Sequence, residues 1–195
     1  AFSRTLQQSN LSNVFEYEVD YQDENSLKHC SEISSKNCDI DLVIVAIGIL
    51  HSSNIMPEKA ISQLSFEKFY KIFEINTIYP AMIGKYFIPK LNKDRKSVFA
   101  ALSARVGSIS DNRVGGWYSY RSSKAALNMI IKNFSIETNR NNKNAIIVGL
   151  HPGTVASSLS KPFQGNVEKS KLFNPDFSAT KLISVLEELS KNSSG

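Results

Sequence analysis

The sequence has few cysteines, no long apolar run and no glycine-rich nucleotide motif. Cys30 and Cys38 lack the spacing of metal ligands or of a CxxC pair, and two thiols do not make a disulfide framework. A reduced, cytoplasmic environment is therefore expected. No apolar run approaches the roughly 20 residues that span a bilayer, and no signal peptide is visible in a chain that begins with Ala rather than Met. No membrane partner is expected.

Positive charge is in slight excess and is spread along the chain. The formal net charge is +5 at pH 7. The densest basic cluster, at residues 90–96, is interpreted as a solvated turn. Nucleic-acid-binding proteins usually gather such charge in runs or on one face, so no nucleic-acid partner is expected. A mild positive bias would suit an anionic cofactor.

Short apolar runs alternate with longer amphipathic stretches. An alternating run predicts a strand at 14–19, and continuous apolar runs predict buried strands at 41–46, 97–102 and 145–150. Helices are predicted from Ser65, over residues 118–139, and after Asn174, which precedes a proline at the first helical position. Pro80 should kink the first helix or restrict its packing. The last helix should have one apolar face, made by Phe177, Leu182, Ile183, Leu186 and Leu189.

This alternation predicts one α/β domain over residues 1–195, a doubly wound, Rossmann-like parallel sheet in three α/β/α layers. Ligands bind beyond the carboxyl ends of such strands. Gly48, Ser103 and residues 151–154 follow the three buried runs. His51 and His151 flank this expected cleft without partners at ligand spacing, so no metal is expected. The aromatic residues at 117 and 118 would either line the substrate entrance or pack against the helix.

Tyr120 and Lys124 are spaced four residues apart, on one face of a predicted helix. A nearby ammonium favours the phenolate and lowers the phenol pKa, which would let the pair exchange a proton with a carbonyl oxygen. The spacing alone is weak, because Tyr86 and Lys90 share it. Pro89 interrupts the helix there, so the second pair is interpreted as structural.

The segment 102–128, which contains Tyr120 and Lys124, resembles the signature stretch of the short-chain dehydrogenase/reductase superfamily. More narrowly, it is similar to the branch of C-factor-type cell–cell signalling proteins and sniffer-like carbonyl reductases. Further matches follow in family order along the chain: Asp20, the run Ala46-Ile-Gly48, Asn76, and the run Pro152-Gly153-Thr154-Val155.

The resemblance implies a role for each matched residue. Tyr120 would be the proton donor or acceptor, and Lys124 would lower the tyrosine pKa and hold the nicotinamide ribose. Asn76 would support a water-bridged proton path through its backbone, or satisfy a helix irregularity before Pro80, or both. The remaining matches would bind cofactor: Asp20 at the adenine, and Ala46, Gly48, Pro152, Gly153, Thr154 and Val155 around the nicotinamide end.

The catalytic serine is the unsettled member of this set. The family usually has two serines at this strand end, and the second orients the substrate carbonyl. Here the pair is Ser103-Ala104. Ser103 lies at the strand end but is one residue out of step, and Ser108 lies 12 residues before Tyr120 in a loop. We favour Ser103, with Ser108 or neither as alternatives.

The glycine-rich dinucleotide fingerprint of the family is not in the sequence, whose first glycine is Gly48. Residues 1–4 resemble the end of the family's second strand, where Arg4 would pair with a 2′-phosphate, favouring NADP over NAD. The first strand and helix and the last strand of the domain are expected to be missing from this chain. The sequence is thus hypothesised to be part of a longer protein, which an intact mass of 21.7 kDa would contradict.

The resulting expectation is an NAD(P)-dependent oxidoreductase of carbonyl or alcohol substrates, assembled as a homodimer or homotetramer. The alternative is a non-catalytic or weakly catalytic dinucleotide-binding signalling protein on the same fold. Ala104 and the missing fingerprint favour the alternative. NADPH consumption with and without Tyr120 separates the two.

Overall fold

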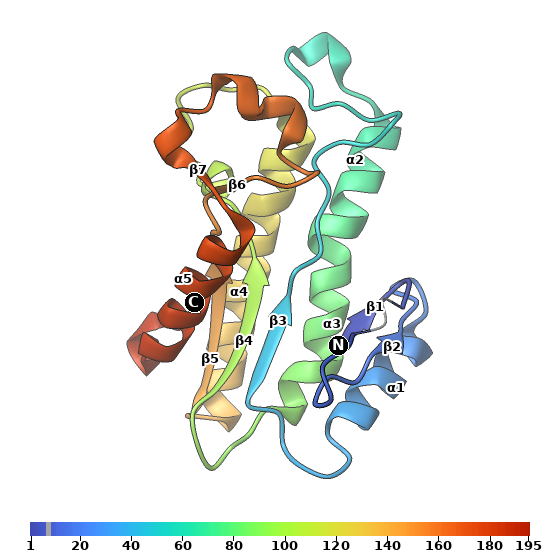
Figure 1. Cartoon of the computed structure of the whole chain (residues 1–195), viewed down its shortest axis with the longest axis vertical. Helices are drawn as coiled ribbons and strands as arrows, with labels where there is room; N and C mark the ends of the chain where they lie inside the picture. Colours follow the sequence, from blue (N-terminus) through green and yellow to red (C-terminus); the bar gives the residue numbers. More distant parts are fainter. Residues whose placement is uncertain (7–8) are drawn as a thin grey trace.

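A three-stranded parallel sheet in the order β3-β4-β5 forms the centre of this computed structural model (Figure 1). Its strands are β3 (Leu42–Val45), β4 (Ser97–Leu102) and β5 (Ala145–Leu150). In the register, Val43 pairs with Phe99, and Phe99 pairs with Ile147. The three predicted buried strands are thereby confirmed. The structure describes residues 1–6 and 9–195, and only the backbone of Asn166.

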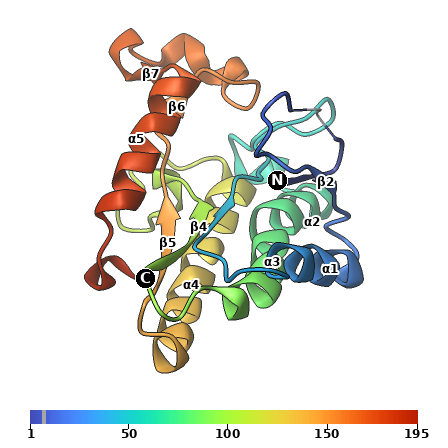
Figure 2. The ribbon, with the colours of Figure 1, turned by 60° about the horizontal axis from the view of Figure 1, so that its bottom comes forward.

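The two faces of this sheet are covered by different helices (Figure 2). Val98, Ala100, Ile146 and Val148 pack with Leu186 of α5 (Pro175–Glu188). Side chains alternate along a strand, so the neighbouring residues point to the opposite face of the sheet. On that face a second core is formed with α1 (Glu24–Ser34), α3 (Tyr79–Phe87) and α4 (Tyr118–Asn141). The strand residues in this core are Phe99, Ala101, Ala145 and Ile147. The expected three α/β/α layers are confirmed.

The predicted helix starts are confirmed at their caps. Ser65 Oγ accepts from Lys68 N at the start of α2 (Phe66–Phe73), and Asn174 Oδ1 accepts from Asp176 N at the start of α5. Helix α2 runs through a π-helical turn, η2 (Glu74–Ile78), into α3, so the irregularity lies just before Pro80. Helix α1 was not predicted.

The predicted apolar face of α5 is only partly correct. Leu186 is buried, and Leu182 and Leu189 pack against the same core. Phe177 and Ile183 are 49% and 53% exposed. Phe177 instead contacts Phe173, with ring centroids 5.5 Å apart. The face is narrower than predicted because α5 packs on β4 and β5 alone, which cover only one stripe of the helix.

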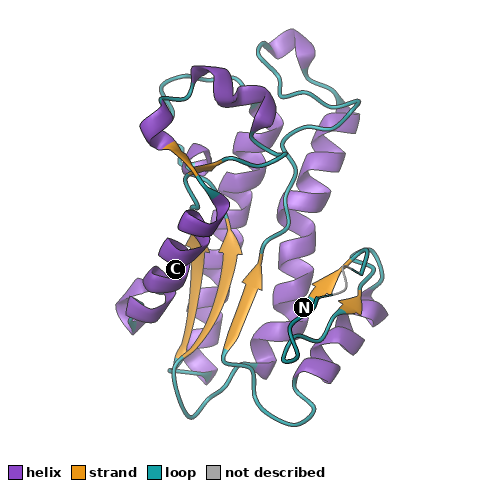
Figure 3. Ribbon diagram, viewed as in Figure 1, coloured by secondary structure: helices purple, strands orange, loops and turns teal. Residues whose placement is uncertain are grey.

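A second parallel pair, β1 (Phe2–Ser3) and β2 (Tyr17–Glu18), lies beside α1 and apart from the central sheet (Figure 3). The strand predicted at 14–19 therefore has only two residues in the ladder. A groove of about 840 Å³ is lined by both pieces of sheet. On the groove side of β3, Leu42 and Ile44 are 46% and 47% exposed.

Short elements complete the chain around the carboxyl ends of the strands. Strand β6 (Thr154–Val155) pairs with β7 (Leu172–Phe173), and residues 156–171 between them contain the 3₁₀ segments η5 (Lys161–Asn166) and η6 (Lys169–Lys171). Further 3₁₀ segments are η1 (Ile61–Gln63), η3 (Ile88–Lys90), η4 (Arg105–Gly107) and η7 (Lys191–Ser193). The Gly195 amide donates to Ile147 O over 2.8 Å, so the C-terminal residues lie along β5.

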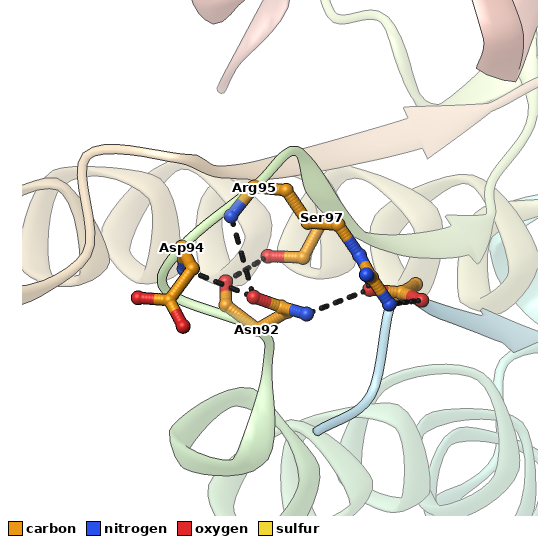
Figure 4. A network of polar contacts seen from close by, with 5 residues as sticks. Asn92, Asp94, Arg95 and Ser97 are labelled. Atoms are coloured by element: carbon orange, nitrogen blue, oxygen red, sulfur yellow. Dashed lines mark hydrogen bonds and ion pairs between the residues drawn. The ribbon is translucent and has the colours of Figure 1, made fainter. Parts of the chain in front are cut away.

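A polar network fastens the opposite end of the sheet (Figure 4). Asn92 Oδ1 accepts from the amides of Asp94 and Arg95, and Ser97 Oγ donates to Asn92 O. The Arg95 guanidinium pairs with both oxygens of Asp41 and holds the pKa of that carboxyl below its usual value. This network joins the segments that precede β3 and β4. Of the helices described, none is long and apolar enough to cross a membrane.

Candidate active site

A cleft of about 1270 Å³ opens at the carboxyl ends of β3, β4 and β5, near the top of Figure 1. Its walls come from the segments after these three strands, from the start of α4, and from residues 156–171. Tyr120 lies in the wall together with Ser103, Pro152, Gly153 and Thr154. The strand ends therefore bring together residues that are distant in the sequence, as the topology predicted.

Tyr120 and Lys124 lie one turn apart on α4, and both are buried: 8% of Tyr120 and 3% of Lys124 is exposed. Lys124 Nζ donates to Leu102 O, at the end of β4, over 2.8 Å. Because an ammonium carries three donors, this bond leaves two of them for other oxygens. The second Tyr–Lys pair is structural as predicted: Tyr86 Oη donates to Glu24 of α1, and Lys90 lies in η3.

Burial shifts the two pKa values in opposite directions. It raises the pKa of Tyr120 to about 12 and lowers that of Lys124 to about 8. Removal from water disfavours the charged form of each group, phenolate in one case and ammonium in the other. The prediction that Lys124 holds the phenol pKa down is not met in this structure, where burial dominates. At neutral pH Tyr120 keeps its proton and Lys124 remains largely charged.

Asn76 is fully buried within the π-helical turn η2. Its Oδ1 accepts from Ile49 N over 2.8 Å, and its Nδ2 donates to Ile49 O and to Ser123 Oγ. The side chain thus ties the segment after β3 to α4, one residue from Lys124. The irregularity expected before Pro80 is confirmed as a π-helical turn, but the Asn76 side chain bonds Ile49 and Ser123 rather than backbone groups of that turn. π-helical turns are frequent at functional sites.

Gly48 faces this arrangement, and Ala46 lines the cleft nearby. A Cβ on Gly48 would lie 3.5 Å from Asn76 Oδ1 and 3.7 Å from Lys124 Nζ. The absence of a side chain therefore leaves the floor beside the ammonium open. Of the run after β5, Pro152, Gly153, Thr154 and Val155 all line the cleft. Ser178 of α5 anchors it through a 2.7 Å hydrogen bond to Pro152 O.

The two candidate serines differ in their surroundings. Ser103 lines the cleft, but its hydroxyl donates to Asn128 Oδ1 over 2.6 Å. Ser108 does not line the cleft and lies within a turn, where its Oγ accepts from Asp111 N. Ala104, at the position of the usual serine, is part of the cleft wall.

Arg4 and Asp20 lie together at a separate hollow of about 430 Å³ beside β2 and the start of α1. Neither lines the main cleft. The carboxylates of Glu18 and Asp23 share the hollow with them. The sequence-predicted site residues thus fall into two groups, one around Tyr120 and one around Arg4.

Three further residues belong to this site. Two of them were not singled out from the sequence, and the role of the third, Trp117, was left open. Trp117 lines the cleft whereas Tyr118 does not, so of the two aromatic residues expected to line the entrance or to pack against the helix, only Trp117 is at the cleft. Phe163 also lines the cleft, from η5. Glu58 is fully buried, and its carboxylate accepts from Ser119 N at the start of α4. The paired glycines before Trp117 were the one sequence signal of an unusual turn here.

A protein-family model described as short chain dehydrogenase matches residues 2–167. The 1-hydroxy-2-glutathionyl-2-methyl-3-butene dehydrogenase of Rhodococcus sp. (strain AD45) is 32% identical over 165 residues, which cover 85% of this chain and 67% of that protein. C-signal of Myxococcus xanthus is 32% identical over 103 residues, 53% of this chain and 61% of that protein. The chain thus matches about two thirds of the length of these relatives.

Solved structures share the fold. The carbonyl reductase Sniffer of D. melanogaster superposes with a TM-score of 0.80 at 22% identity, over 95% of this chain and 75% of that one. Two further structures of this fold contain NADP or NADPH. C-signal and Sniffer belong to the two kinds of protein that the sequence pattern resembled.

Proposed function

The chain belongs to the short-chain dehydrogenase family, and on this premise we propose that it is an NAD(P)-dependent oxidoreductase of carbonyl or alcohol substrates. The observation that carries the proposal is the pairing on α4 of buried Lys124 with Tyr120, which is also buried and lines the cleft at the strand ends. Oxidoreductase relatives and NADP-containing structures of the same fold support it.

The residues around Lys124 fit the nicotinamide end of such a cofactor. Gly48 leaves space beside the ammonium, and among the described residues Lys124 donates one hydrogen bond, to Leu102 O. Two remaining donors would hold ribose hydroxyls. The run from Pro152 to Val155 would lie along the nicotinamide, and Arg4 with Asp20 would hold the adenosine end. When bound, the cofactor supplies or accepts the hydride at the substrate carbon.

Tyr120 would move the proton in this reaction. Burial keeps the phenol protonated at neutral pH, since its pKa is raised to about 12. In the direction of reduction, the phenol would therefore donate its proton to the carbonyl oxygen as the hydride arrives. The ammonium of Lys124 would then stabilise the phenolate that remains. Asn76 would hold the segment after β3 against α4, which keeps the floor of the cleft in place.

The test is NADPH consumption with a panel of aldehydes, ketones and quinones. Tyr120→Phe is expected to lower kcat/KM by about 10²- to 10⁴-fold, the usual contribution of a positioned proton donor. Tyr118→Phe is the matched control, because that residue is on the same helix turn but outside the cleft wall. Equal rates in the wild type and Tyr120→Phe would exclude the proposed role.

The second candidate is a dinucleotide-binding signalling protein with little or no turnover. Ala104 in the cleft wall and the hydroxyl of Ser103 bonded to Asn128 favour it, because the Ser103 hydroxyl must leave Asn128 before it can donate to a carbonyl. NADPH binding without turnover of any substrate in the panel would support this candidate over the oxidoreductase.

We also propose a homodimer or homotetramer in the cytoplasm. Exposed apolar side chains on α2 and α4 are available for association: Phe66, Tyr70, Met129 and Ile136. Light scattering on a sizing column would test the assembly, and a monomer mass would contradict it. Cys30 and Cys38 are both free thiols, in keeping with a reducing compartment.

A further inference from the structure

The wall of the cleft around Tyr120 is aromatic. The Trp117 ring lies edge-on to the Tyr120 ring, with centroids 6.2 Å apart. Phe163 of η5 also contacts the indole, at a centroid distance of 5.0 Å. Among the described residues that line the cleft, none is acidic, and most are apolar. An apolar wall beside the proton donor favours an apolar group next to the reacting carbonyl.

Trp117 is held in an unusual backbone conformation. Its φ is +50°, and it is the single non-glycine residue with positive φ among those the structure describes. Gly115 and Gly116 before it have φ of +69° and +63°. A left-handed conformation strains a residue with a side chain, and such strain gathers where a site needs a side chain in a fixed place.

Glu58 fixes this turn from the loop after β3. Its main-chain oxygen accepts from Trp117 N over 2.5 Å, and its carboxylate oxygen Oε2 accepts from Ser119 N over 3.2 Å. Glu58 is 0% exposed, and Oε1 has no hydrogen-bond partner in the described structure. Burying a carboxyl group is costly, and here two hydrogen bonds from the turn, from Trp117 N and Ser119 N, hold Glu58 against it.

The other half of the aromatic wall is fixed in a similar way. The His51 ring lies edge-on to Phe163, with centroids 5.7 Å apart, and His51 Nε2 donates to Ser158 O over 3.0 Å. These contacts tie residues 156–171 to the segment after β3. The Phe163 ring therefore contacts both His51 and Trp117.

We propose that Trp117 and Phe163 form a recognition wall for aromatic carbonyl substrates, with the flat ring of the substrate packed on the wall and its carbonyl at Tyr120. The inference rests on the proposed oxidoreductase function and narrows its substrate class. Aromatic rings attract one another in stacked or edge-on pairs beyond what burial alone supplies. A saturated ring of the same size cannot make that contact.

The test compares benzaldehyde with cyclohexanecarboxaldehyde, which have the same carbon skeleton but differ in planarity and aromaticity. The quantity measured is the ratio of their kcat/KM values with NADPH, in wild type and variants, so that intrinsic carbonyl reactivity cancels between enzymes. Phe163→Leu is expected to lower the ratio by roughly five- to tenfold, from the loss of an aromatic contact. Trp117→Leu should lower it in the same direction.

Phe15→Leu is the matched control, because Phe15 is 69% exposed and outside the cleft wall. It should leave the ratio within about twofold, as surface changes do. An unchanged ratio in Phe163→Leu, with turnover that still depends on Tyr120, would overturn the inference and leave the proposed function standing. No turnover of benzaldehyde by the wild type, with Tyr120-dependent turnover of another carbonyl compound in the panel, would overturn the inference alone. Turnover indifferent to Tyr120→Phe would overturn both.

Discussion

Ser103 Oγ donates to Asn128 Oδ1 over 2.6 Å, which ties the end of β4 to the face of α4 that carries Tyr120 and Lys124. Asn128 lies one turn beyond Lys124, so the side chains of Tyr120, Lys124 and Asn128 follow one another along α4. The serine hydroxyl keeps its lone pairs but commits its proton to Asn128. For Ser103 to act in catalysis, its hydrogen bond to Asn128 must be exchanged for one to the substrate.

We expect Ser103→Ala to lower kcat by roughly 10²- to 10³-fold, the usual effect of removing one oxyanion-type donor. Ser108→Ala should change kcat little, because Ser108 lies in a turn outside the cleft wall. Steady-state kinetics with NADPH and a substrate from the panel would distinguish them. The opposite order would assign the role to Ser108, and two small effects would show that neither serine acts.

Lys124 should make stability depend on pH. Burial lowers its folded-state pKa from 10.5 to about 8, so between these values the unfolded chain binds a proton that the folded chain does not. Stability then rises with pH through this window. From pH 8 to pH 10, the free energy of unfolding should rise by about 2 kcal/mol relative to Lys124→Met. Urea unfolding of both proteins at the two pH values measures the difference.

Tyr120 acts with the opposite sign at higher pH. Its folded-state pKa of about 12 exceeds the ordinary value of 10, so above pH 10 the unfolded chain loses a proton that the folded chain keeps. Stability should fall there, and Tyr120→Phe should remove that part of the fall. For Lys124, the contradicting result would be unfolding free energies of the wild type and Lys124→Met that change in parallel between pH 8 and pH 10, because the lowered pKa of Lys124 requires them to diverge.

Arg4 should govern the choice between the two nicotinamide cofactors. A guanidinium beside a 2′-phosphate makes charge-assisted hydrogen bonds that the unphosphorylated cofactor lacks. Arg4→Ala is therefore expected to raise the KM for NADPH by about tenfold or more and to leave the KM for NADH nearly unchanged. Glu18 and Asp23 share the hollow, and their carboxylates would oppose the phosphate. Arg140→Ala, at the far end of α4, is the charge-matched control.

If both KM values rise equally in Arg4→Ala, Arg4 binds a part that the two cofactors share. If neither rises, Arg4 is a surface charge. Either outcome would contradict the preference for NADP over NAD that is inferred from Arg4.

The groove between β1 and β3 would accommodate one more parallel strand. The strands on both sides run within parallel ladders, and Leu42 and Ile44 leave nearly half of their surface exposed toward it. Unpaired strand edges and apolar side chains are costly inside a sheet. We expect the protein isolated from its natural source to have an intact mass above 21.7 kDa, the mass of this chain. A mass of 21.7 kDa would contradict this.

Elements whose stability is local, or depends on burial alone, were predictable from the order of amino acids. Strands β4 and β5 have the predicted bounds, because a continuous apolar run is compatible only with burial on both faces. The caps of α2 and α5 follow from the side-chain oxygens of Ser65 and Asn174, which bond within the same chain segment. The order of Gly48, Tyr120 and Pro152 along the chain was enough to predict one shared cleft.

Features that depend on partners distant in sequence became visible in the folded structure alone. The π-helical turn at Asn76 is held by bonds to Ile49 and Ser123, and the direction of the Ser103 hydroxyl is set by Asn128. The pKa shifts of Tyr120 and Lys124 come from burial, which no spacing reveals. Sequence periodicity determined where the elements lie because it reports burial within one segment. The chemistry of the site depends on contacts between segments, and those exist only once the chain has folded.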